Sequence, residues 1–405
     1  MSNLLAQSVE ILTTALAVAG MGYFLAALLA ARLFIAGRRA ALPAFAPGVS
    51  ILKSLKGLDP GMIDAFRSHC RQTYSGDVEM LFGVSSLTDP AAAAVEQLQK
   101  EFPAQSIQLV RCPTQLGTNG KVSTLVQLAA QARNNFLLIN DSDITVSPRY
   151  LERVMAHFAP PHGDALPASH SGEAHKEVGL VTALYRGQAH GTLPSRLEAL
   201  GIATDFQAGV LLSKMIEGGL HYGLGSTLAI SRVALEKIGG LAPLVDHLAD
   251  DYELGARVSR AGYRVVLSAE VVETAIPAYG WRAFIDHQLR WARTVRDARP
   301  AGYAGLLFTH GLPLALLNVL ASGLSPLSLW LLGLSFFLRL SLAMTVGAEV
   351  LGDHQVLPNL WLLPLRDLVA MGVWMAGFAG NTIVWRGQRF LLRAGKLEPL
   401  PNQGA

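Results

Sequence analysis

Two carboxylates one residue apart follow an apolar segment of strand length near the middle of the chain. The segment Phe136 to Asn140 runs directly into Asp141 and Asp143. Side chains at positions i and i+2 of an extended chain point to the same side, so both carboxylates could converge beyond the strand end. Hard oxygen ligands in that arrangement suit Mg²⁺ or Mn²⁺, which usually keep further positions for phosphate oxygens. The alternative is an ordinary polar turn, since Asp and Ser are common turn and N-cap residues.

Other polar groups with chemical potential also have ordinary explanations. Asp89 stands directly before a proline, a pattern typical of a helix N-cap. Asp250 and Asp251 stand at a predicted helix start, where the helix dipole favours acidic residues. Lys121 follows a glycine-rich loop and could be a solvated lysine. The His-Gln-Leu-Arg-Trp segment at 287–291 precedes an apolar block and could be a basic-aromatic membrane anchor.

The composition indicates a membrane protein. Of 405 residues, 51% are hydrophobic and 16% charged, and the mean hydropathy is +0.34. These values are unusual for a soluble enzyme. The net charge of +3, without a long basic run, argues against a nucleic-acid partner. Cys70 and Cys112 lack metal-type spacing, which argues against a zinc site or a disulfide scaffold and favours a reducing setting for the polar part.

The N-terminal segment is predicted to be a membrane anchor. Ile11 to Ile35 is almost wholly apolar and exceeds the about 20 residues that span a bilayer. A cleaved signal peptide is the alternative, but no basic residue precedes the run, and its length exceeds the roughly 7–15 residues of a signal core. Arg32, Arg38 and Arg39 then place the N-terminus outside and the following chain in the cytoplasm. We expect a signal anchor over residues 1–40.

Residues 301–405 are predicted to form a second membrane region with a basic tail. A cytoplasmic domain and a cytoplasmic tail require an even number of spans between them. We expect two, at about Leu327 to Val346 and Leu362 to Trp385, with Gly305 to Ala321 interfacial or re-entrant. A third span would put the tail outside. The basic residues of the tail are Arg386, Arg389, Arg393 and Lys396.

The charged residues within these apolar blocks should face protein. Arg339 and the pair Arg366 and Asp367 lie inside the predicted membrane region. Ionisable groups at membrane depth normally avoid lipid by pairing or by reaching the interface.

Residues 41–300 have the sequence pattern of an α/β domain. Predicted strands alternate with predicted helices, which indicates βαβ units and a mostly parallel sheet. Asp59 and Asp89, each followed by proline, are expected to cap helices ending at Cys70 and Glu101. The stretch Leu197 to Met215 could be a core helix or one on the membrane surface, and Pro160 to Lys176 is expected to be a mobile surface loop. The predicted strands are at 49–52, 78–84, 107–110, 136–140, 178–184, 225–230 and 263–267.

The order and spacing of the polar groups resemble one known family. The chain resembles the inverting family-2 glycosyltransferases of the GT-A fold, in the ceramide glucosyltransferase-like branch. The stretch Val178 to Arg186 and the His-Gln-Leu-Arg-Trp segment also resemble bacterial relatives that attach an amino sugar to hopanoid tetrols. The segments that carry the resemblance are 47–60, Thr88-Asp89-Pro90, Gly117 to Lys121, Asp141-Ser142-Asp143, Ala249 to Tyr252 and Arg290-Trp291, followed by membrane segments.

The resemblance implies roles on the donor side. Asp89 would contact the uridine half of a UDP-sugar, and Lys121 would lie near the nucleotide. Asp143, with Asp141 beside it, would hold a divalent metal, Mg²⁺ or Mn²⁺, that bridges the two phosphates. Arg290 would face the diphosphate.

The resemblance also implies a catalytic base and an acceptor site. Asp251 would be the base that takes the proton of the acceptor hydroxyl, with Arg290 stabilising the leaving group. Trp291, His287 and Asp250 would lie on the acceptor side. His287 departs from the family, which usually has Gln or Arg at this position. The complete Asp-Ser-Asp triplet, whose second acid the animal ceramide enzymes lack, favours a bacterial relative with metal binding.

The sequence therefore predicts a multi-pass enzyme with its catalytic domain in the cytoplasm, in a bacterial cytoplasmic membrane. It would move a hexose, glucose or N-acetylglucosamine, from a UDP-sugar to a lipid hydroxyl. The expected acceptor is ceramide, a sphingolipid. A hopanoid polyol is the alternative acceptor, and diacylglycerol or polyprenyl phosphate is less favoured. A processive polysaccharide synthase is disfavoured because few spans follow the domain. A catalytically inactive membrane scaffold and a transporter are the non-enzymatic alternatives.

Overall fold

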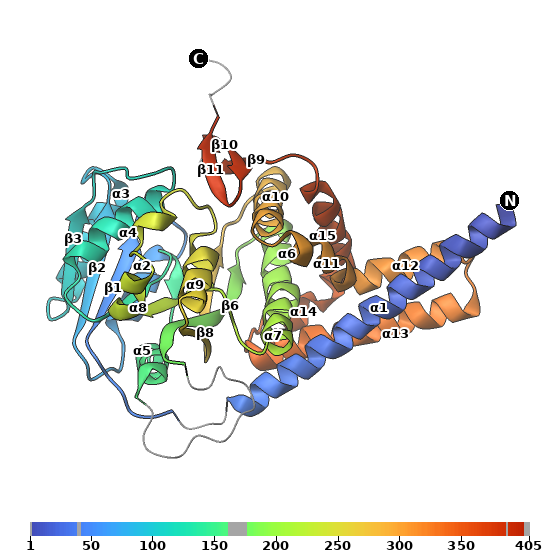
Figure 1. The fold of residues 1–405 in the computed structure, drawn as a ribbon, viewed down its shortest axis with the longest axis horizontal. Coiled ribbons are helices and arrows are strands. Elements are labelled where there is room, and N and C mark those ends of the chain that lie inside the picture. Colours follow the sequence, from blue (N-terminus) through green and yellow to red (C-terminus); the bar gives the residue numbers. More distant parts are fainter. Residues whose placement is uncertain (1, 39–41, 161–175, 386–387, 401–405) are drawn as a thin grey trace. The chain divides into compact units, whose positions relative to one another are not determined.

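The structure, a computed structural model, describes residues 2–38, 42–160, 176–385 and 388–400 (Figure 1). The chain forms two compact units, each built from separate stretches of sequence. We call the unit of residues 40–186 and 216–275 the sheet unit. We call the unit of residues 1–39, 187–215 and 276–405 the helical unit. The predicted loop at 160–176 lies almost entirely outside the described residues.

The sheet unit is built on an eight-stranded sheet with the order β3-β2-β1-β4-β7-β6-β8-β5. Strands β1 to β4 run parallel, whereas β7 is antiparallel to both β4 and β6, and β5 is antiparallel to β8. The predicted Rossmann-like sheet is thus confirmed. The strands are β1 (Val49–Ser54), β2 (Val78–Val84), β3 (Ser106–Arg111), β4 (Phe136–Ile139), β5 (Ile144–Thr145), β6 (Val178–Ala189), β7 (Leu228–Ser231) and β8 (Arg264–Ile276).

The strand order reverses between β1 and β4. The chain adds β2 and then β3 on one side of β1 and returns to place β4 on the other side. Ile51 at the centre of β1 pairs with Met80 on one side and Leu138 on the other, and all three are buried. Such near-continuous apolar strands are expected where helices cover both faces of a parallel sheet. Ligands of open α/β sheets bind at this kind of reversal, beyond the carboxyl ends of the strands.

The helices of the sheet unit mostly begin where the sequence indicates, with one exception. Asp89 caps its helix as predicted. Asp59 does not, because its helix begins at Met62 behind Gly61, which has a φ of 72°. Both aspartates stand directly before a proline, but the Asp59 carboxylate binds Ser142 instead of capping a helix. The helices are α2 (Met62–Cys70), α3 (Pro90–Glu101), α4 (Gly120–Gln131), α5 (Tyr150–Met155), α8 (Arg232–Lys237) and α9 (Asp250–Arg260).

The helical unit contains four helical segments that are long and apolar enough to cross a membrane. They cover 4–37, 300–321, 326–350 and 356–377. The N-terminal one agrees with the predicted anchor, whereas three rather than two follow the sheet unit. Figure 1 shows α1, α12 and α13 side by side, with α15 at an angle to them. The helices are α1 (Ser2–Gly37), α6 (Leu193–Gly201), α7 (Gln207–Ile216), α10 (Trp281–Ala298), α11 (Pro300–Gly305), α12 (Gly311–Ala321), α13 (Pro326–Ala343), α14 (Val356–Asn359) and α15 (Leu363–Gly377).

The charged residues of the apolar segments are paired inside the helical unit, as predicted. Arg339 on α13 is 2% exposed and makes a two-pronged ion pair with Asp367 on α15, at 2.8 and 2.9 Å. Arg339 also donates to the carbonyl and hydroxyl of Thr204, and Arg366 pairs with Asp205 at 2.8 Å. Thr204 and Asp205 lie in a π-helical turn, Ile202–Phe206, between α6 and α7. These contacts make the 197–215 stretch part of the buried core of its unit.

The basic tail forms a small antiparallel sheet that the sequence did not indicate. Its strands are β9 (Thr382–Trp385), β10 (Gln388–Arg393) and β11 (Lys396–Pro399). The end of the predicted span at Trp385 is therefore wrong, because the last helix ends at Gly377. Arg293 and Arg296 of α10 donate to backbone carbonyls between residues 377 and 382. The tail is thus fastened to α10.

Candidate active site

The Asp-Ser-Asp triplet lies at the carboxyl end of β4, where the strand order reverses. The chain turns at Ser142 and Asp143 instead of staying extended, so the two acids have different neighbours. Oδ2 of Asp143 accepts hydrogen bonds from Thr274 Oγ1 at 2.5 Å and from the Ala275 N–H at 3.2 Å. Burial, and next the charge of Asp141, raise the pKa of Asp143 above its ordinary value. A cation at this point would relieve that unfavourable charge.

Lys121 joins the triplet to the acidic pair of α9. Its Nζ lies 2.7 Å from Asp141 Oδ1 and 3.4 Å from Asp250 Oδ2. Burial alone would lower the pKa of Lys121, but the surrounding carboxylates outweigh it and raise the pKa above the ordinary value. The lysine is therefore charged, and the alternative of a solvated loop lysine is wrong. Three elements, β4, α4 and α9, meet at this ammonium group.

Asp251 lies in the first turn of α9 beside the triplet. Its Oδ1 accepts a hydrogen bond from the Tyr252 N–H at 2.8 Å. A Cβ atom built on Gly225 would lie 3.0 Å from Asp251 Oδ2 and 3.6 Å from Asp141 Oδ2. The two carboxylates thus border one small space that only glycine leaves open. Burial, and next the charge of Asp250, raise the pKa of Asp251 to about 6, although Lys121 partly opposes this.

Asp89 fulfils its ordinary structural role and holds a second loop as well. Its Oδ1 accepts from the Ala91 N–H at 2.9 Å, which caps α3, and from the Gly57 N–H at 2.9 Å. Gly57 has a φ of 71°, a conformation that favours glycine. Both hydrogen bonds fall on one oxygen of the carboxylate, and the residue remains partly exposed. Asp89 is thus compatible with the N-cap prediction and with a further ligand contact.

The glycine-rich loop at 117–120 packs on the segment that leads into α9. A Cβ atom at Gly117 would lie 2.6 Å from the Val245 carbonyl oxygen. The Thr118 N–H and hydroxyl both donate to Asp246 Oδ1, at 2.9 and 3.1 Å. Buried Asn119 caps α4 through Val122 and donates to the His247 carbonyl at 2.7 Å. This glycine therefore allows close backbone packing, which places Lys121.

Two further residues of the site were given no role there by the sequence, although both lie in the 47–60 segment. Lys53, at the end of β1, is fully buried and donates to the Asp141 carbonyl at 3.0 Å. Burial lowers its pKa to about 7, against the opposing effect of Asp143 and Asp141. Asp59 Oδ2 accepts a 2.5 Å hydrogen bond from Ser142 Oγ, which explains why it does not cap α2. Their partners lie 88 and 83 residues away along the chain.

The second group of predicted site residues lies on α10 in the helical unit. His287 and Trp291 are one helical turn apart, with ring centroids separated by 5.1 Å. Trp291 also lies 6.2 Å from the ring of Phe206. His287 Nδ1 is 3.1 Å from Oε2 of Glu198, a buried residue of α6 that the sequence analysis missed. The helix thus carries an aromatic surface with a polar group beside it.

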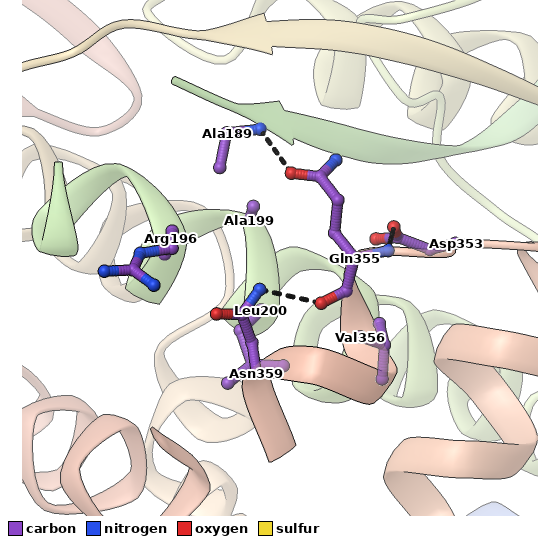
Figure 2. A pocket seen from close by; sticks show the side chains of 8 residues that line it. All are labelled: Ala189, Arg196, Ala199, Leu200, Asp353, Gln355, Val356 and Asn359. Atoms are coloured by element: carbon purple, nitrogen blue, oxygen red, sulfur yellow. Dashed lines mark hydrogen bonds between the residues drawn. The ribbon is translucent and has the colours of Figure 1, made fainter. Parts of the chain in front are cut away.

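The neighbouring crevice on α6 is closed. Its empty volume is about 190 Å³, but it does not admit a water molecule. Figure 2 shows the Gln355 side chain reaching Ala189 at the end of β6, where it accepts the backbone N–H at 3.0 Å. Gln355 also donates to the Gly187 carbonyl at 3.3 Å. The crevice is therefore a packing feature that fixes the entry to α6.

A model of glycosyl transferase family 21 matches residues 12–398 of the chain. The chain belongs to glycosyl transferase family 21. It is 24% identical over 364 residues to ceramide glucosyltransferase 3 of Caenorhabditis elegans, covering 86% of this chain and 73% of that protein. Ceramide glucosyltransferase 1 of the same organism is 22% identical over 363 residues, covering 86% and 72%. This family 21 protein is therefore an enzyme, a hexosyltransferase.

A solved structure shares its fold. The mannosyltransferase PcManGT from Pyrobaculum calidifontis, solved with GDP-Man and Mn²⁺, superposes with a TM-score of 0.53 at 18% identity. The match covers 91% of this chain and 97% of that one. The predicted GT-A fold is thus confirmed, together with helices long enough to cross a membrane.

The residues that the sequence predicts for the site lie in both units. The sheet unit carries the predicted base, most of the predicted donor-side residues and Asp250, which was predicted on the acceptor side. The helical unit carries the other two predicted acceptor residues and Arg290, whose charge acts on Tyr279. The first group comprises Asp89, Lys121, Asp141, Asp143, Asp250 and Asp251; the second comprises His287, Arg290 and Trp291.

The space beside Gly225 gives a direct test of the first group. Gly225→Ala would push a methyl group between the carboxylates of Asp251 and Asp141, so we expect slower sugar transfer, and Gly225→Val should abolish it. Gly120→Ala is the matched control, since a Cβ there has no heavy atom within 4 Å. Transfer rates and unfolding temperatures of the detergent-purified variants provide the measurement. Wild-type rates in Gly225→Val would mean that the reaction does not use this space.

Proposed function

We propose that this family 21 enzyme moves a hexose from a UDP-sugar to a hydroxyl group of a membrane lipid, with inversion at the sugar carbon. The observation that carries the proposal is the partly buried Asp251 carboxylate near Asp141 and Lys121 at the sheet edge. The candidate membrane helices of the same chain support a lipid as acceptor. The ceramide glucosyltransferases among its relatives favour a ceramide-type lipid.

Asp143 and Asp141 are the residues that would hold a divalent cation. Within the described ranges, no cluster of three His, Cys, Asp or Glu residues could hold a metal ion. A cation bound here would therefore depend on phosphate oxygens and water for most of its ligands. Mg²⁺ and Mn²⁺ at nucleotide sites bind in this way, through one or two carboxylates. Such a cation would neutralise charge on the leaving diphosphate.

The hydrogen bonds to these carboxylates leave part of each one for this task. Thr274 and Ala275 both occupy Oδ2 of Asp143, so a cation would bind through Oδ1. Lys121 pairs with Oδ1 of Asp141 and would stabilise a bound nucleotide from the same place. Asp89 would bind the uridine through the oxygen that does not cap α3. Arg290 would add a positive charge for the diphosphate.

Asp251 would act as the general base. A carboxylate with a pKa of about 6 is ionised at neutral pH, yet more basic than an ordinary aspartate. It would accept the proton of the lipid hydroxyl while that oxygen attacks the sugar carbon and the diphosphate leaves. One base on the acceptor side is sufficient for a single displacement, which inverts the configuration. No second carboxylate has to act as a nucleophile.

Product analysis tests the proposed reaction. Detergent-purified enzyme is given UDP-glucose or UDP-N-acetylglucosamine with Mg²⁺ or Mn²⁺, and ceramide, bacteriohopanetetrol or diacylglycerol as acceptor. We expect a glycosylated ceramide, identified by mass and by the β linkage that inversion of an α-linked donor gives. A product with bacteriohopanetetrol alone would replace the acceptor. Release of free sugar without any lipid product would overturn the lipid acceptor and retain the donor.

The base role predicts a separation of binding from transfer. Asp251→Asn should bind UDP like the wild type but lose transfer by about 10²–10⁴-fold, because the proton acceptor is gone. Since only ionised Asp251 accepts a proton, wild-type kcat/KM should rise with pH through about 6 and then level off. Glu253→Gln, which removes another acid from the first turn of α9, is the control. Equal loss of UDP binding and transfer in Asp251→Asn would refute the role.

The metal role predicts a graded effect at Asp143. Asp143→Asn should raise the Mn²⁺ concentration for half-maximal UDP-sugar binding by at least about tenfold, because a charged ligand is lost. Thr274→Val, which removes only a hydrogen bond to Asp143, should raise it less. Isothermal titration of UDP-sugar at fixed Mn²⁺ concentrations measures both. An unchanged metal requirement in Asp143→Asn would place the metal elsewhere.

A further inference from the structure

Glu198 gathers three side-chain donors on one oxygen atom. Its Oε2 accepts hydrogen bonds from His287 Nδ1 at 3.1 Å, from Gln288 Nε2 at 3.1 Å and from the Tyr279 hydroxyl. The Glu198 side chain is 2% exposed. Three donors on one oxygen are the pattern of an ionised carboxylate, which can only accept. A buried carboxylate requires such hydrogen bonds, so the arrangement is stable only with these partners present.

This arrangement fixes the proton on the His287 ring. Against a carboxylate that can only accept, Nδ1 of His287 must carry a hydrogen. In the neutral ring the other nitrogen, Nε2, then keeps a lone pair that can accept a hydrogen bond. Within the described part of the chain, both hydrogen bonds of the ring fall on Nδ1. The side chain is 24% exposed, so part of the ring is open to a ligand.

The surroundings of His287 fit the polar end of a lipid. Trp291, one turn further along α10, and Phe206 beside it provide an apolar aromatic surface. A hydrogen-bond acceptor next to such a surface suits a donor group attached to a hydrocarbon chain. The hydroxyl that reacts cannot serve, because its proton goes to the base. The group that fits is a second donor of the headgroup, a neighbouring hydroxyl or an amide N–H.

We propose that Glu198 is a positioning residue that holds His287 with Nε2 ready to accept a hydrogen bond from a second donor group of the acceptor lipid. The proposal rests on the proposed function and deepens it. It predicts that the enzyme selects lipids whose headgroup has an amide or a second hydroxyl in addition to the reacting hydroxyl. Ceramide and polyol lipids have such a group, whereas diacylglycerol does not. Selection would therefore come from one buried carboxylate acting through the histidine.

The competing explanation is that Glu198 only fastens α10 to α6. A variant of Gln288 distinguishes the two explanations, because Gln288 donates one of the same hydrogen bonds to Glu198 without touching the His287 ring. Gln288→Leu weakens the attachment and leaves the His287 tautomer unchanged. Glu198→Gln keeps the volume but replaces an acceptor-only group by an amide that can donate to Nδ1, which releases the tautomer. A structural role would make both variants alike.

The first experiment reads the tautomer without any substrate. The full-length protein in detergent is labelled with ¹⁵N-histidine, and the His287 signal is assigned by its loss in His287→Gln. We expect a neutral ring protonated at Nδ1 in the wild type and in Gln288→Leu, and a shift toward protonation at Nε2 in Glu198→Gln. A wild-type ring protonated at Nε2 would overturn the proposal. This readout remains valid even if the proposed transfer reaction fails.

The second experiment measures how strongly the enzyme selects between acceptor lipids. The ratio of kcat/KM for ceramide over its 3-O-methyl ether, which lacks the second hydroxyl, and over N-methylceramide, which lacks the amide N–H, is measured for each variant. We expect a high wild-type ratio for one of the two pairs. It should fall by about 10–100-fold in Glu198→Gln, as when other histidines lose an orienting carboxylate, and stay high in Gln288→Leu. If the kcat/KM ratio fell equally in both variants, or if the wild type did not prefer ceramide over either analogue, Glu198 would be only a structural contact. Absence of transfer to ceramide itself would instead count against the proposed function.

Discussion

The partly buried ammonium group of Lys121 makes the acidic edge of the sheet possible. Asp141, Asp250 and Asp251 are brought together there by different elements, and like charges at such separations repel strongly in a protein interior. Lys121 pairs with two of them directly. Its position depends in turn on Asn119 and Gly117, which hold the start of α4 against the segment before α9. The site is therefore assembled before any donor binds.

Local sequence rules identified the elements of this site better than its contacts. Asp89 and Asp59 precede prolines in the same way, yet only Asp89 caps a helix. The difference lies in Ser142, which reaches Asp59 from far along the chain. Most strand positions along the chain could be predicted because apolar runs and turn residues are local signals, whereas the order of the strands within the sheet was not predicted. Which oxygen of which acid remains for a ligand depends on tertiary contacts, and no local pattern encodes them.

Lys53 and Glu198 show the same limit more sharply. Lys53 lies in a buried strand within the 47–60 segment, and nothing in that segment indicates its contact with Asp141. Glu198 lies in a helix whose mixed pattern fits either a core or a membrane-surface position. Its donors follow 81 to 90 residues later. A buried charge can be recognised as important only when its partners are known, and here the partners come from distant parts of the chain.

The tail holds the two ends of the apolar region together. Arg293 and Arg296 of α10 donate to backbone carbonyls at the end of α15 and just after it. Among the described residues, three helical segments long and apolar enough to cross a membrane lie between these contacts. In Figure 1, α15 runs at an angle to α1, α12 and α13, which pack side by side.

Contacts with Glu198 and with the tail hold α10 at two places along its length. Glu198 holds its first half through His287 and Gln288, and the tail holds its second half through Arg293 and Arg296. Trp291 and Arg290 lie between these two attachments. A helix held at two places loses little further conformational freedom when a lipid binds, so more of the contact energy is available for binding and selection. In this enzyme, selectivity for the acceptor would then depend on residues that never touch the lipid.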